Sequence, residues 1–282
     1  MNTKLILIEG LPGSGKSTTA GMAAEILKQK GIETNLFLEG NLDHPADYDG
    51  VAFFSKGEWN SLLADFPSIK ALLNEKGFQK DVGYFLPYQK LGRSTPDGFF
   101  ERVLKHDVYE LPLDLNIKLI KENWKRFGER AKKEDMVYIF ECCFIQNPVT
   151  VGMVKYGASN EMVKNYVLAL EKSIRELNPI LIYINQRDLD YSFKKTIKER
   201  PQSWSEGFIN YYTIQGHGKL NHLAGVEGTI KVLKARRELE LDILNELSIR
   251  KSIVDNSSFD KNIHKNAMEA LLNNHLNQKG NV

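Results

Sequence analysis

The stretch KLILIEGLPGSGKST, residues 4–18, decides the fold of this chain. Its first half is a continuous aliphatic run, which is typical of a strand buried on both faces of a parallel sheet. Its second half, Gly10–Ser17, matches the pattern G-x-x-x-x-G-K-[ST]. A helix is expected from about residue 17 to residue 29, because Gly31 follows and stops it. The sequence therefore predicts a strand, a glycine-rich turn and a helix in direct succession.

A loop of this spacing has a mechanical reason to bind phosphate. Its glycines let the backbone curl until successive N–H groups face inward as a nest for an anion, and the positive end of the following helix points to the same place. Lys16 is expected to reach the β- and γ-phosphates of a nucleotide, and the Ser17 hydroxyl to ligate Mg²⁺. We predict that the loop binds ATP or GTP with Mg²⁺; the alternative is a glycine-rich turn without a ligand. The residues predicted to bind the nucleotide are Gly10, Pro12, Gly13, Ser14, Gly15, Lys16, Ser17 and Thr18.

Four further short runs are predicted as strands, at about residues 33–38, 136–140, 179–184 and 252–254. Helical patterns lie between the strands, and the predicted helices begin near residues 112, 161, 228 and 260. This alternation predicts an α/β fold with a parallel sheet and helices on both of its faces.

Residues 45–135 separate the second predicted strand from the third. We interpret this segment as a helical insertion into a single domain whose core is residues 1–44 and 136–282. Its aromatic residues are expected to form the core of the insertion, and some of them to line an acceptor pocket. These aromatic residues are Phe53, Phe54, Trp59, Tyr84, Phe85, Tyr88, Phe99 and Phe100.

Charged residues that follow the strands are the candidates for catalysis, because ligands of such sheets bind beyond the carboxyl ends of the strands. Glu39 ends the second predicted strand and is predicted to take the proton of an attacking hydroxyl; the alternative is a solvated loop residue or a helix cap. Glu141 ends the third and is predicted to hold Mg²⁺ or contact the acceptor; the alternative is a salt bridge at the strand end. Gln146 and Asn147 follow as possible amide contacts.

Basic residues follow the fourth predicted strand, namely Arg187, Lys194, Lys195, Lys198 and Arg200. They are expected either to close over the phosphates and neutralise charge in the transition state, or to form a plain solvated face. Arg200 is the preferred lid cation, because it precedes Pro201 and can stand at the end of a mobile segment.

Composition limits the partners and the compartment. The formal net charge is +2 over 282 residues, so no global field indicates a nucleic acid as the main partner. No stretch approaches the roughly 18 apolar residues of a membrane-spanning helix. The adjacent Cys142 and Cys143 are expected on a strand with their side chains on opposite faces, as buried residues of a cytoplasmic protein rather than a metal or redox pair.

Taken together, these residues resemble the P-loop kinase group that includes thymidylate, deoxynucleoside and small-metabolite kinases. The features that carry the resemblance are Gly10–Ser17, the Glu39 loop, Glu141, the basic helix after strand four, and Val254–Ser258 as last strand and base-proximal loop. The resemblance implies a three-layer fold with sheet order 2-3-1-4-5, an acceptor-binding insertion between strands two and three, and an arginine-bearing lid. The chain departs from deoxynucleoside kinases, because Cys142 stands where they carry an arginine and its lid is mainly lysine.

The sequence thus predicts an ATP-dependent phosphotransferase acting on a small hydroxyl- or phosphate-bearing acceptor. Lys16, Glu39, Glu141 and Arg200 are the predicted catalytic residues, and Ser17 and Glu141 the predicted metal ligands. The alternative is an NTPase or nucleotide-switched module without a small-molecule acceptor. The sequence leaves the acceptor and the oligomeric state open.

Overall fold

A computed structural model describes residues 3–92 and 95–277 of the chain. The chain divides into two compact units. The core unit comprises Met1–Glu39 and Trp124–Val282, and the insertion unit comprises Gly40–Asn123. The two units are described separately below.

The core unit is built on a five-stranded parallel sheet, in the order β2-β6-β1-β7-β8. Its strands are β1 (Leu5–Gly10), β2 (Thr34–Phe37), β6 (Val137–Glu141), β7 (Ile180–Asn185) and β8 (Arg250–Asp255). All six residues of β1 are buried, because the strand is central and covered on both faces. Since every strand of this sheet runs in one direction, their carboxyl ends meet at a single edge.

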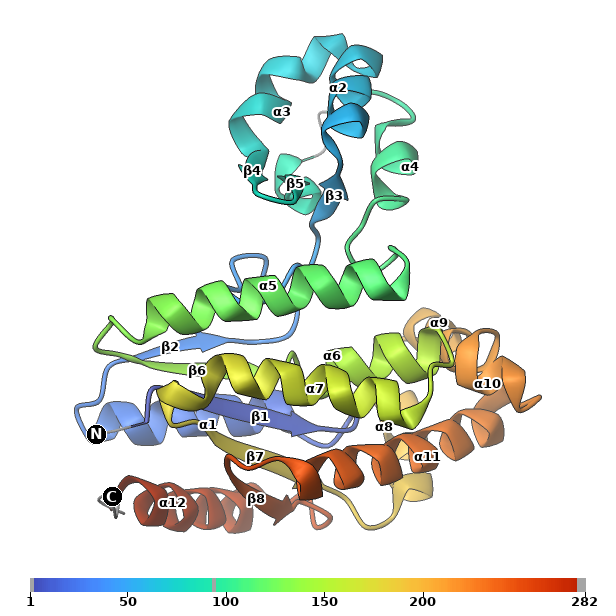
Figure 1. The fold of residues 1–282 in the computed structure, drawn as a ribbon. Coiled ribbons are helices and arrows are strands. Elements are labelled where there is room, and N and C mark those ends of the chain that lie inside the picture. Colours follow the sequence, from blue (N-terminus) through green and yellow to red (C-terminus); the bar gives the residue numbers. More distant parts are fainter. Residues whose placement is uncertain (1–2, 93–94, 278–282) are drawn as a thin grey trace. The chain divides into compact units, whose positions relative to one another are not determined.

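Helices cover both faces of this sheet (Figure 1). The helices of the core unit are α1 (Lys16–Gln29), α6 (Gln146–Val149), α7 (Asn160–Ile174), α8 (Leu189–Glu199), α9 (Gln202–Thr213), α10 (Gly216–Leu220), α11 (Gly225–Glu246) and α12 (Lys261–Asn277). A π-helical segment η3 (Thr150–Lys155) continues α6, and a short 3₁₀ turn η4 (Arg175–Leu177) ends α7. Helix α5 (Leu113–Ala131) runs from the insertion unit into the core unit.

Alternation along the strands divides the core between the two faces. On one face, Ile6 and Ile8 of β1 pack with Ala23 and Leu27 of α1 and with Met268 of α12. On the other face, aromatic rings join the sheet to α5. The Phe127 ring lies edge-on to Tyr138, at 5.0 Å between ring centroids, and Trp124 lies edge-on to Phe140.

Helices α5 and α7 approach each other closely on the second face. A Cβ built on Gly128 of α5 would lie 2.2 Å from the carbonyl oxygen of Ser173 in α7, which is far inside contact distance. Glycine is therefore required at residue 128 by packing. By contrast, a Cβ built on Gly21 of α1 meets no atom within 4 Å.

The insertion unit has its own sheet and its own apolar core. Three antiparallel strands occur in the order β3-β5-β4, namely β3 (Ala52–Phe54), β5 (Gly83–Leu86) and β4 (Phe78–Lys80). Its helices are α2 (Lys56–Asp65), η1 (Pro67–Ile69), α3 (Lys70–Lys76), η2 (Tyr88–Leu91) and α4 (Phe99–Leu104). Phe54, Trp59, Leu62, Leu86 and Phe99 are among the buried residues of its core.

The structure confirms the α/β fold with a parallel sheet. The insertion was expected to be helical, and its three-stranded sheet is a correction. Those strands have only three or four residues each, too few to show an alternating pattern in the sequence. The insertion unit also has other boundaries than the expected 45–135, since it spans residues 40–123. Its second boundary comes earlier because the last part of α5 packs on the sheet of the core unit. Within the described residues, no helix is long and apolar enough to cross a membrane.

We predict that Gly128→Ala lowers the free energy of unfolding by about 1 to 3 kcal/mol, because the added methyl group overpacks the contact between α5 and α7. Urea denaturation followed by circular dichroism measures this change. The control is Gly21→Ala, which places the same group in open space on a helix and should stabilise the chain slightly. Equal unfolding midpoints for the two variants would contradict the packing argument.

Candidate functional site

The loop between β1 and α1 has the curled backbone that its glycines allow. Gly10, Gly13 and Gly15 have φ angles of 142°, 80° and 97°, which side-chain-bearing residues rarely adopt. Two of these glycines are also close to neighbouring elements. A Cβ on Gly10 would lie 2.4 Å from the carbonyl oxygen of Ile184, and one on Gly13 would lie 2.3 Å from the Thr196 hydroxyl. The loop is thus seated tightly against β7 and α8.

The start of α1 is open to an anion. Its N-cap, Gly15, provides no side-chain hydrogen bond, and the first turn contains no acidic residue. The first N–H groups of a helix have no partner within the helix, so these groups can bind a ligand. The hydroxyl of Ser14 is buried without a hydrogen-bond partner, and the Nζ of Lys16 is 3.1 Å from the carbonyl oxygen of Leu11. The loop contains the donors for a phosphate chain.

Two side-chain amides donate hydrogen bonds to backbone carbonyl oxygens of the loop. The Nδ2 of Asn256 donates to the carbonyl oxygen of Ser14 at 2.8 Å, and the Nε2 of Gln186 donates to that of Gly13 at 3.4 Å. These bonds engage the carbonyl groups of Gly13 and Ser14 and use no N–H group of the loop. The sequence interpretation assigned no such role to either residue. Both directly follow strands β7 and β8, and the strand-end rule missed them because it was applied to charged residues and these two side chains are uncharged amides.

Glu141 connects the phosphate loop to the Glu39 segment. Its Oε1 accepts the Ser17 hydroxyl at 2.6 Å, and its Oε2 accepts the backbone N–H of Glu39 at 3.2 Å. The Glu39 carboxylate in turn accepts the Nε2 of Gln146 at 3.1 Å. The structure therefore brings Ser17, Glu141, Glu39 and Gln146 together as one hydrogen-bonded chain. Among the described residues, Glu141 is thus bonded to a hydroxyl and a backbone amide, rather than to the cation of a strand-end salt bridge.

Glu9 is a site residue that the sequence interpretation missed. It is fully buried at the end of β1, and its carboxylate accepts the backbone N–H groups of Phe144 and Gln146 at 2.8 and 2.9 Å. Burial raises the pKa of Glu9 to about 7, although these N–H groups favour the charged form. Glu9 thereby fixes the turn after β6 and the position of Gln146, the first residue of α6. An acidic residue inside an otherwise aliphatic strand was the available signal.

The two cysteines lie in this turn rather than on a strand, which corrects the sequence interpretation. Cys142 has a φ angle of 64°, an unusual value for a residue with a side chain. Both cysteines are buried, and neither takes part in a disulfide. Burial, with the negative charges of Glu39 and Glu9, raises the pKa of Cys142 well above its usual value, so the thiol stays protonated and unreactive.

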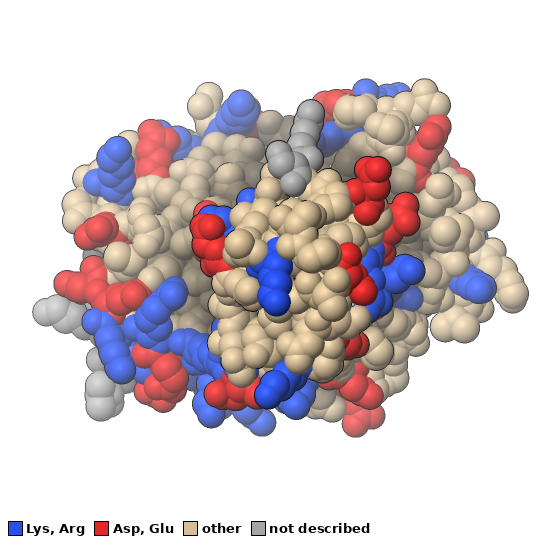
Figure 2. All heavy atoms as spheres, turned by 90° about the horizontal axis from the view of Figure 1, so that it is seen from above, with Lys and Arg blue, Asp and Glu red and all other residues tan. Residues whose placement is uncertain are grey.

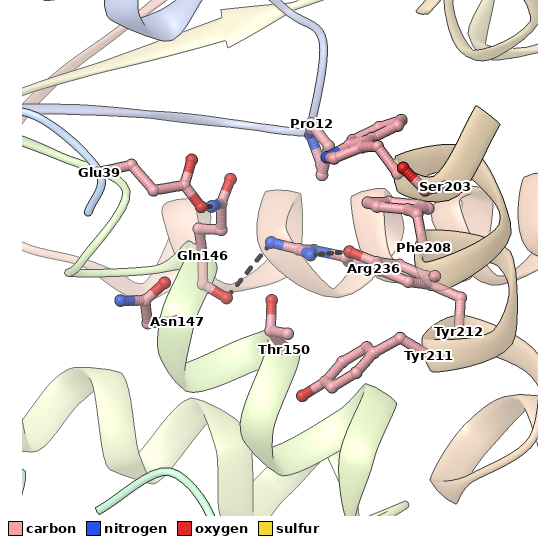
Figure 3. A pocket seen from close by; sticks show the side chains of 12 residues that line it. Pro12, Glu39, Gln146, Asn147, Thr150, Ser203, Phe208, Tyr211, Tyr212 and Arg236 are labelled. Carbon is pink, nitrogen blue, oxygen red and sulfur yellow. Dashed lines mark hydrogen bonds between the residues drawn. The ribbon is translucent and has the colours of Figure 1, made fainter. Parts of the chain in front are cut away.

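A pocket of about 400 Å³ opens beside Glu39 and Gln146 (Figure 3). Its volume is in the range of small-molecule sites. One side consists of residues that follow β6, and the other consists of aromatic residues of α9. The lining residues are Pro12, Glu39, Gln146, Asn147, Thr150, Ser203, Trp204, Gly207, Phe208, Tyr211, Tyr212 and Arg236. Within the core unit, the lining includes α9 and α11 residues that sequence reasoning had not selected.

A buried ion pair forms the floor of this pocket. Arg236 and Glu240 of α11 are both fully buried, and the Nε of Arg236 donates to the Glu240 carboxylate at 2.7 Å. The Tyr183 hydroxyl donates to the same carboxylate, and the guanidinium also donates to the Tyr212 hydroxyl and to the carbonyl oxygen of Gln146. Burial acts to lower the pKa of Arg236, but the interactions with Tyr212 and with the Glu240 carboxylate outweigh it and raise the pKa. The guanidinium therefore stays charged.

The predicted lid is helix α8 and the residue that follows it. Arg200 is at the C-terminal cap of α8, one turn after Thr196, which contacts the phosphate loop at Gly13. Its guanidinium lies over the ring of Trp204, 5.6 Å from the centroid, while Trp204 itself lines the pocket. Lys194 and Lys195 form exposed ion pairs with Glu227 and Glu199, as on an ordinary solvated face.

The described residues, 3–92 and 95–277, include no group of three or more His, Cys, Asp or Glu side chains arranged to hold a metal ion. A Mg²⁺ bound with a nucleotide does not need such a group, because phosphate oxygens and water supply most of its ligands. Ser17 is suited to contribute one further ligand to such an ion. Its hydroxyl donates a hydrogen bond to Glu141, so the lone pairs of its oxygen stay available to a metal ion. No family model and no curated protein matches this chain.

We predict that Glu240→Gln lowers the free energy of unfolding by about 3 to 5 kcal/mol, because it leaves the buried Arg236 charge without its counter-charge. The double variant Arg236→Met/Glu240→Leu should recover most of this loss, since it removes both charges and keeps the volume. Urea denaturation of the three proteins measures the difference. A double variant no more stable than Glu240→Gln would contradict a cost that arises from the unpaired charge.

Proposed function

We propose that this protein is a kinase that transfers the γ-phosphate of ATP to a small acceptor bound in the pocket beside Glu39. One observation carries the proposal: the hydrogen-bonded chain from Ser17 through Glu141 and Glu39 to Gln146. This chain begins in the phosphate loop and ends in the lining of a pocket of small-molecule size. A phosphoryl-transfer enzyme needs its donor and acceptor sites to adjoin in this way.

The phosphate loop supplies the donor site. The uncapped N-terminus of α1, the unpartnered Ser14 hydroxyl and the buried Lys16 ammonium suit a triphosphate. Lys16 neutralises charge on the phosphate chain, and the loop amides orient it. Mg²⁺, when bound beside Ser17 and Glu141, would supply further charge neutralisation for the transferring phosphate.

Glu39 is the proposed general base. Its backbone is tied to Glu141 and its carboxylate to Gln146, so it is held between the phosphate loop and the pocket. An exposed carboxylate oriented in this way can accept the proton of an acceptor hydroxyl as that hydroxyl attacks phosphorus. Arg200, one turn beyond the loop contact of α8, is the proposed lid cation.

The sheet order and the surface charge also support this proposal. Counted without the strands of the insertion unit, the order β2-β6-β1-β7-β8 reads 2-3-1-4-5, as the resemblance to P-loop kinases implies. On the face shown in Figure 2, basic and acidic side chains lie intermingled rather than gathered by sign. A mixed surface favours a small molecule over a nucleic acid as the substrate.

We predict that Mg-ATP binds to the wild-type protein and that Lys16→Ala weakens this binding by at least tenfold, because the variant loses the cation of the loop. Isothermal titration calorimetry with Mg-ATP and Mg-GTP measures both affinities. The matched control is Lys28→Ala, an exposed position in the last turn of the same helix, which should leave the affinity unchanged. Absence of binding by the folded wild-type protein would refute the donor site.

We predict that Glu39→Gln retains Mg-ATP binding and loses phosphate transfer by 10²- to 10⁴-fold, the usual size of a general-base contribution. Transfer of labelled γ-phosphate to a panel of alcohols, sugars and nucleosides measures this loss. The matched control is Glu33→Gln, an exposed residue just before β2, which should transfer at the wild-type rate. Phosphate release at one rate with and without every acceptor would instead favour the NTPase alternative.

A further inference from the structure

Strand β8 is an open edge of the core sheet. In the order β2-β6-β1-β7-β8 it comes last, with β7 as its neighbour on the inner side (Figure 1). Among residues 3–92 and 95–277, no strand pairs with the outer side of β8. An open edge presents a row of backbone N–H and C=O groups that can pair with another strand. The side chains of the edge decide which strand that is.

The register with β7 determines which backbone groups of β8 face outward. Asn185 lies opposite Asp255 in this parallel pair, and its carbonyl oxygen accepts the N–H of Asn256. The even-numbered residues of β8 therefore bond to β7, and Lys251, Ile253 and Asp255 direct their N–H and C=O groups to the outer side. Among the described residues, no turn or loop hydrogen bond uses the backbone groups of these three residues. They are available to a further strand.

The same three residues have their side chains on one exposed face of β8. Residues 251, 253 and 255 are exposed, whereas residues 250 and 252 are half-buried and residue 254 is buried. The side chain of Ile253 is 56% exposed, although isoleucine is among the residues most often buried in proteins. The edge thus presents an apolar side chain with a cation two residues before it and a carboxylate two residues after it.

This order of side chains is complementary to itself. In an antiparallel pair of two β8 strands centred on Ile253, the two Ile253 side chains lie opposite each other, and Lys251 of each copy lies opposite Asp255 of the other. All of these are hydrogen-bonded pairs, whose opposite side chains project to the same face and can interact. A pair centred on Ser252 or Val254 would lose both charge pairs. Charge complementarity therefore selects one register.

A lone lysine on an edge strand ordinarily prevents pairing, because its charge has no partner on the added strand. In β8 the carboxylate four residues further along removes this obstacle for a second copy of the same chain. Lys251 also has a donor to spare. Its ammonium group has three N–H donors, and it bonds to two carbonyl oxygens, those of Asn245 and Leu247.

The Asp255 carboxylate can accept a further donor as well. It accepts the hydroxyl and the backbone N–H of Ser257, and it forms an ion pair of 2.7 Å with Arg187. The side chain of Arg187 is 80% exposed, and an exposed ion pair of this kind contributes little to stability. Because a carboxylate has about four acceptor positions, Lys251 of a second copy can bind without displacing these partners.

We propose that the protein forms a two-fold symmetric dimer in which β8 pairs in antiparallel fashion with β8 of a second copy. The five-stranded sheet of one copy then continues into that of the other. A contact made by one short strand is smaller than the roughly 1,200 Å² of stable interfaces, so the dimer is in reversible equilibrium with the monomer. This inference does not depend on the proposed kinase function.

Charge exchange tests the pairing. Sedimentation velocity of the full chain at about 5 to 500 µM measures the Kd of the dimer, and we expect the wild type to pass from monomer to dimer over this range. Lys251→Asp or Asp255→Lys brings like charges together at two places in the dimer, so each should raise the Kd at least tenfold. The combined variant Lys251→Asp/Asp255→Lys restores both pairs and should return the Kd to within about threefold of the wild type. The control Lys261→Asp makes the same charge change at the exposed first residue of α12 and should leave the Kd unchanged.

Ile253→Pro tests the backbone pairing separately. The N–H of Ile253 faces the outer side of β8, so proline removes this donor without removing a hydrogen bond to β7. The central pair of the dimer loses both of its N–H donors, and we expect no dimer over the whole concentration range. Far-ultraviolet circular dichroism checks that the variant is folded. If it is not, the charge-exchange series decides alone.

Several outcomes would overturn the inference. A wild-type protein that stays monomeric up to the highest concentration would show that the edge does not bind a second copy. A dimer whose Kd is the same in both single charge variants would be formed by another surface. A folded combined variant that dimerises no better than the single variants would contradict the register centred on Ile253.

Discussion

The candidate site depends on a curled glycine-rich loop and on the first backbone N–H groups of α1, which have no partner within the helix. Such groups cost free energy in a folded protein unless a ligand or water binds them, so the surrounding chain has to hold them open. Here Asn256 and Gln186 engage the loop carbonyls, while β7 and α8 leave no room for a side chain on Gly10 or Gly13. The glycines thus satisfy two demands at once, left-handed backbone and close approach.

Carboxylates on three adjacent strand ends organise what lies next to this loop. Glu9 is buried and fixes the turn after β6, Glu141 joins that strand to Ser17, and Glu39 extends the chain to Gln146. These carboxyl groups are tolerated in one region because each has specific donors around it, and because burial raises the pKa of Glu9 to about 7 and so favours its neutral form. The proposed donor and acceptor sites are therefore positioned by the same sheet edge, with little dependence on flexible loops.

The buried pair of Arg236 and Glu240 has a different role. The Arg236 guanidinium lines the pocket, but its hydrogen bonds go to protein groups, namely Glu240, Tyr212 and the carbonyl oxygen of Gln146. The guanidinium binds the Gln146 backbone and Tyr212 of α9, so it fastens the two walls of the pocket to α11. The hydrogen bonds of this buried guanidinium therefore order the walls of the pocket.

The sequence by itself determined the parallel sheet, the curled glycine-rich loop between β1 and α1, and the choice of Glu39 and Glu141 as candidates. It could do so because buried strands, glycine spacing and strand-end carboxylates are local patterns. The three short strands of the insertion unit could not be predicted from the sequence, since three or four residues are too few to show the alternation of apolar and polar residues that marks a strand. The roles of Glu9 and Asn256 could not be predicted either, because their partners are at least 135 residues away in the chain. The bond from Arg236 to the carbonyl oxygen of Gln146 likewise spans 90 residues. Only the tertiary structure decided which aromatic residues line the pocket, because that depends on how α9 packs beside the residues after β6.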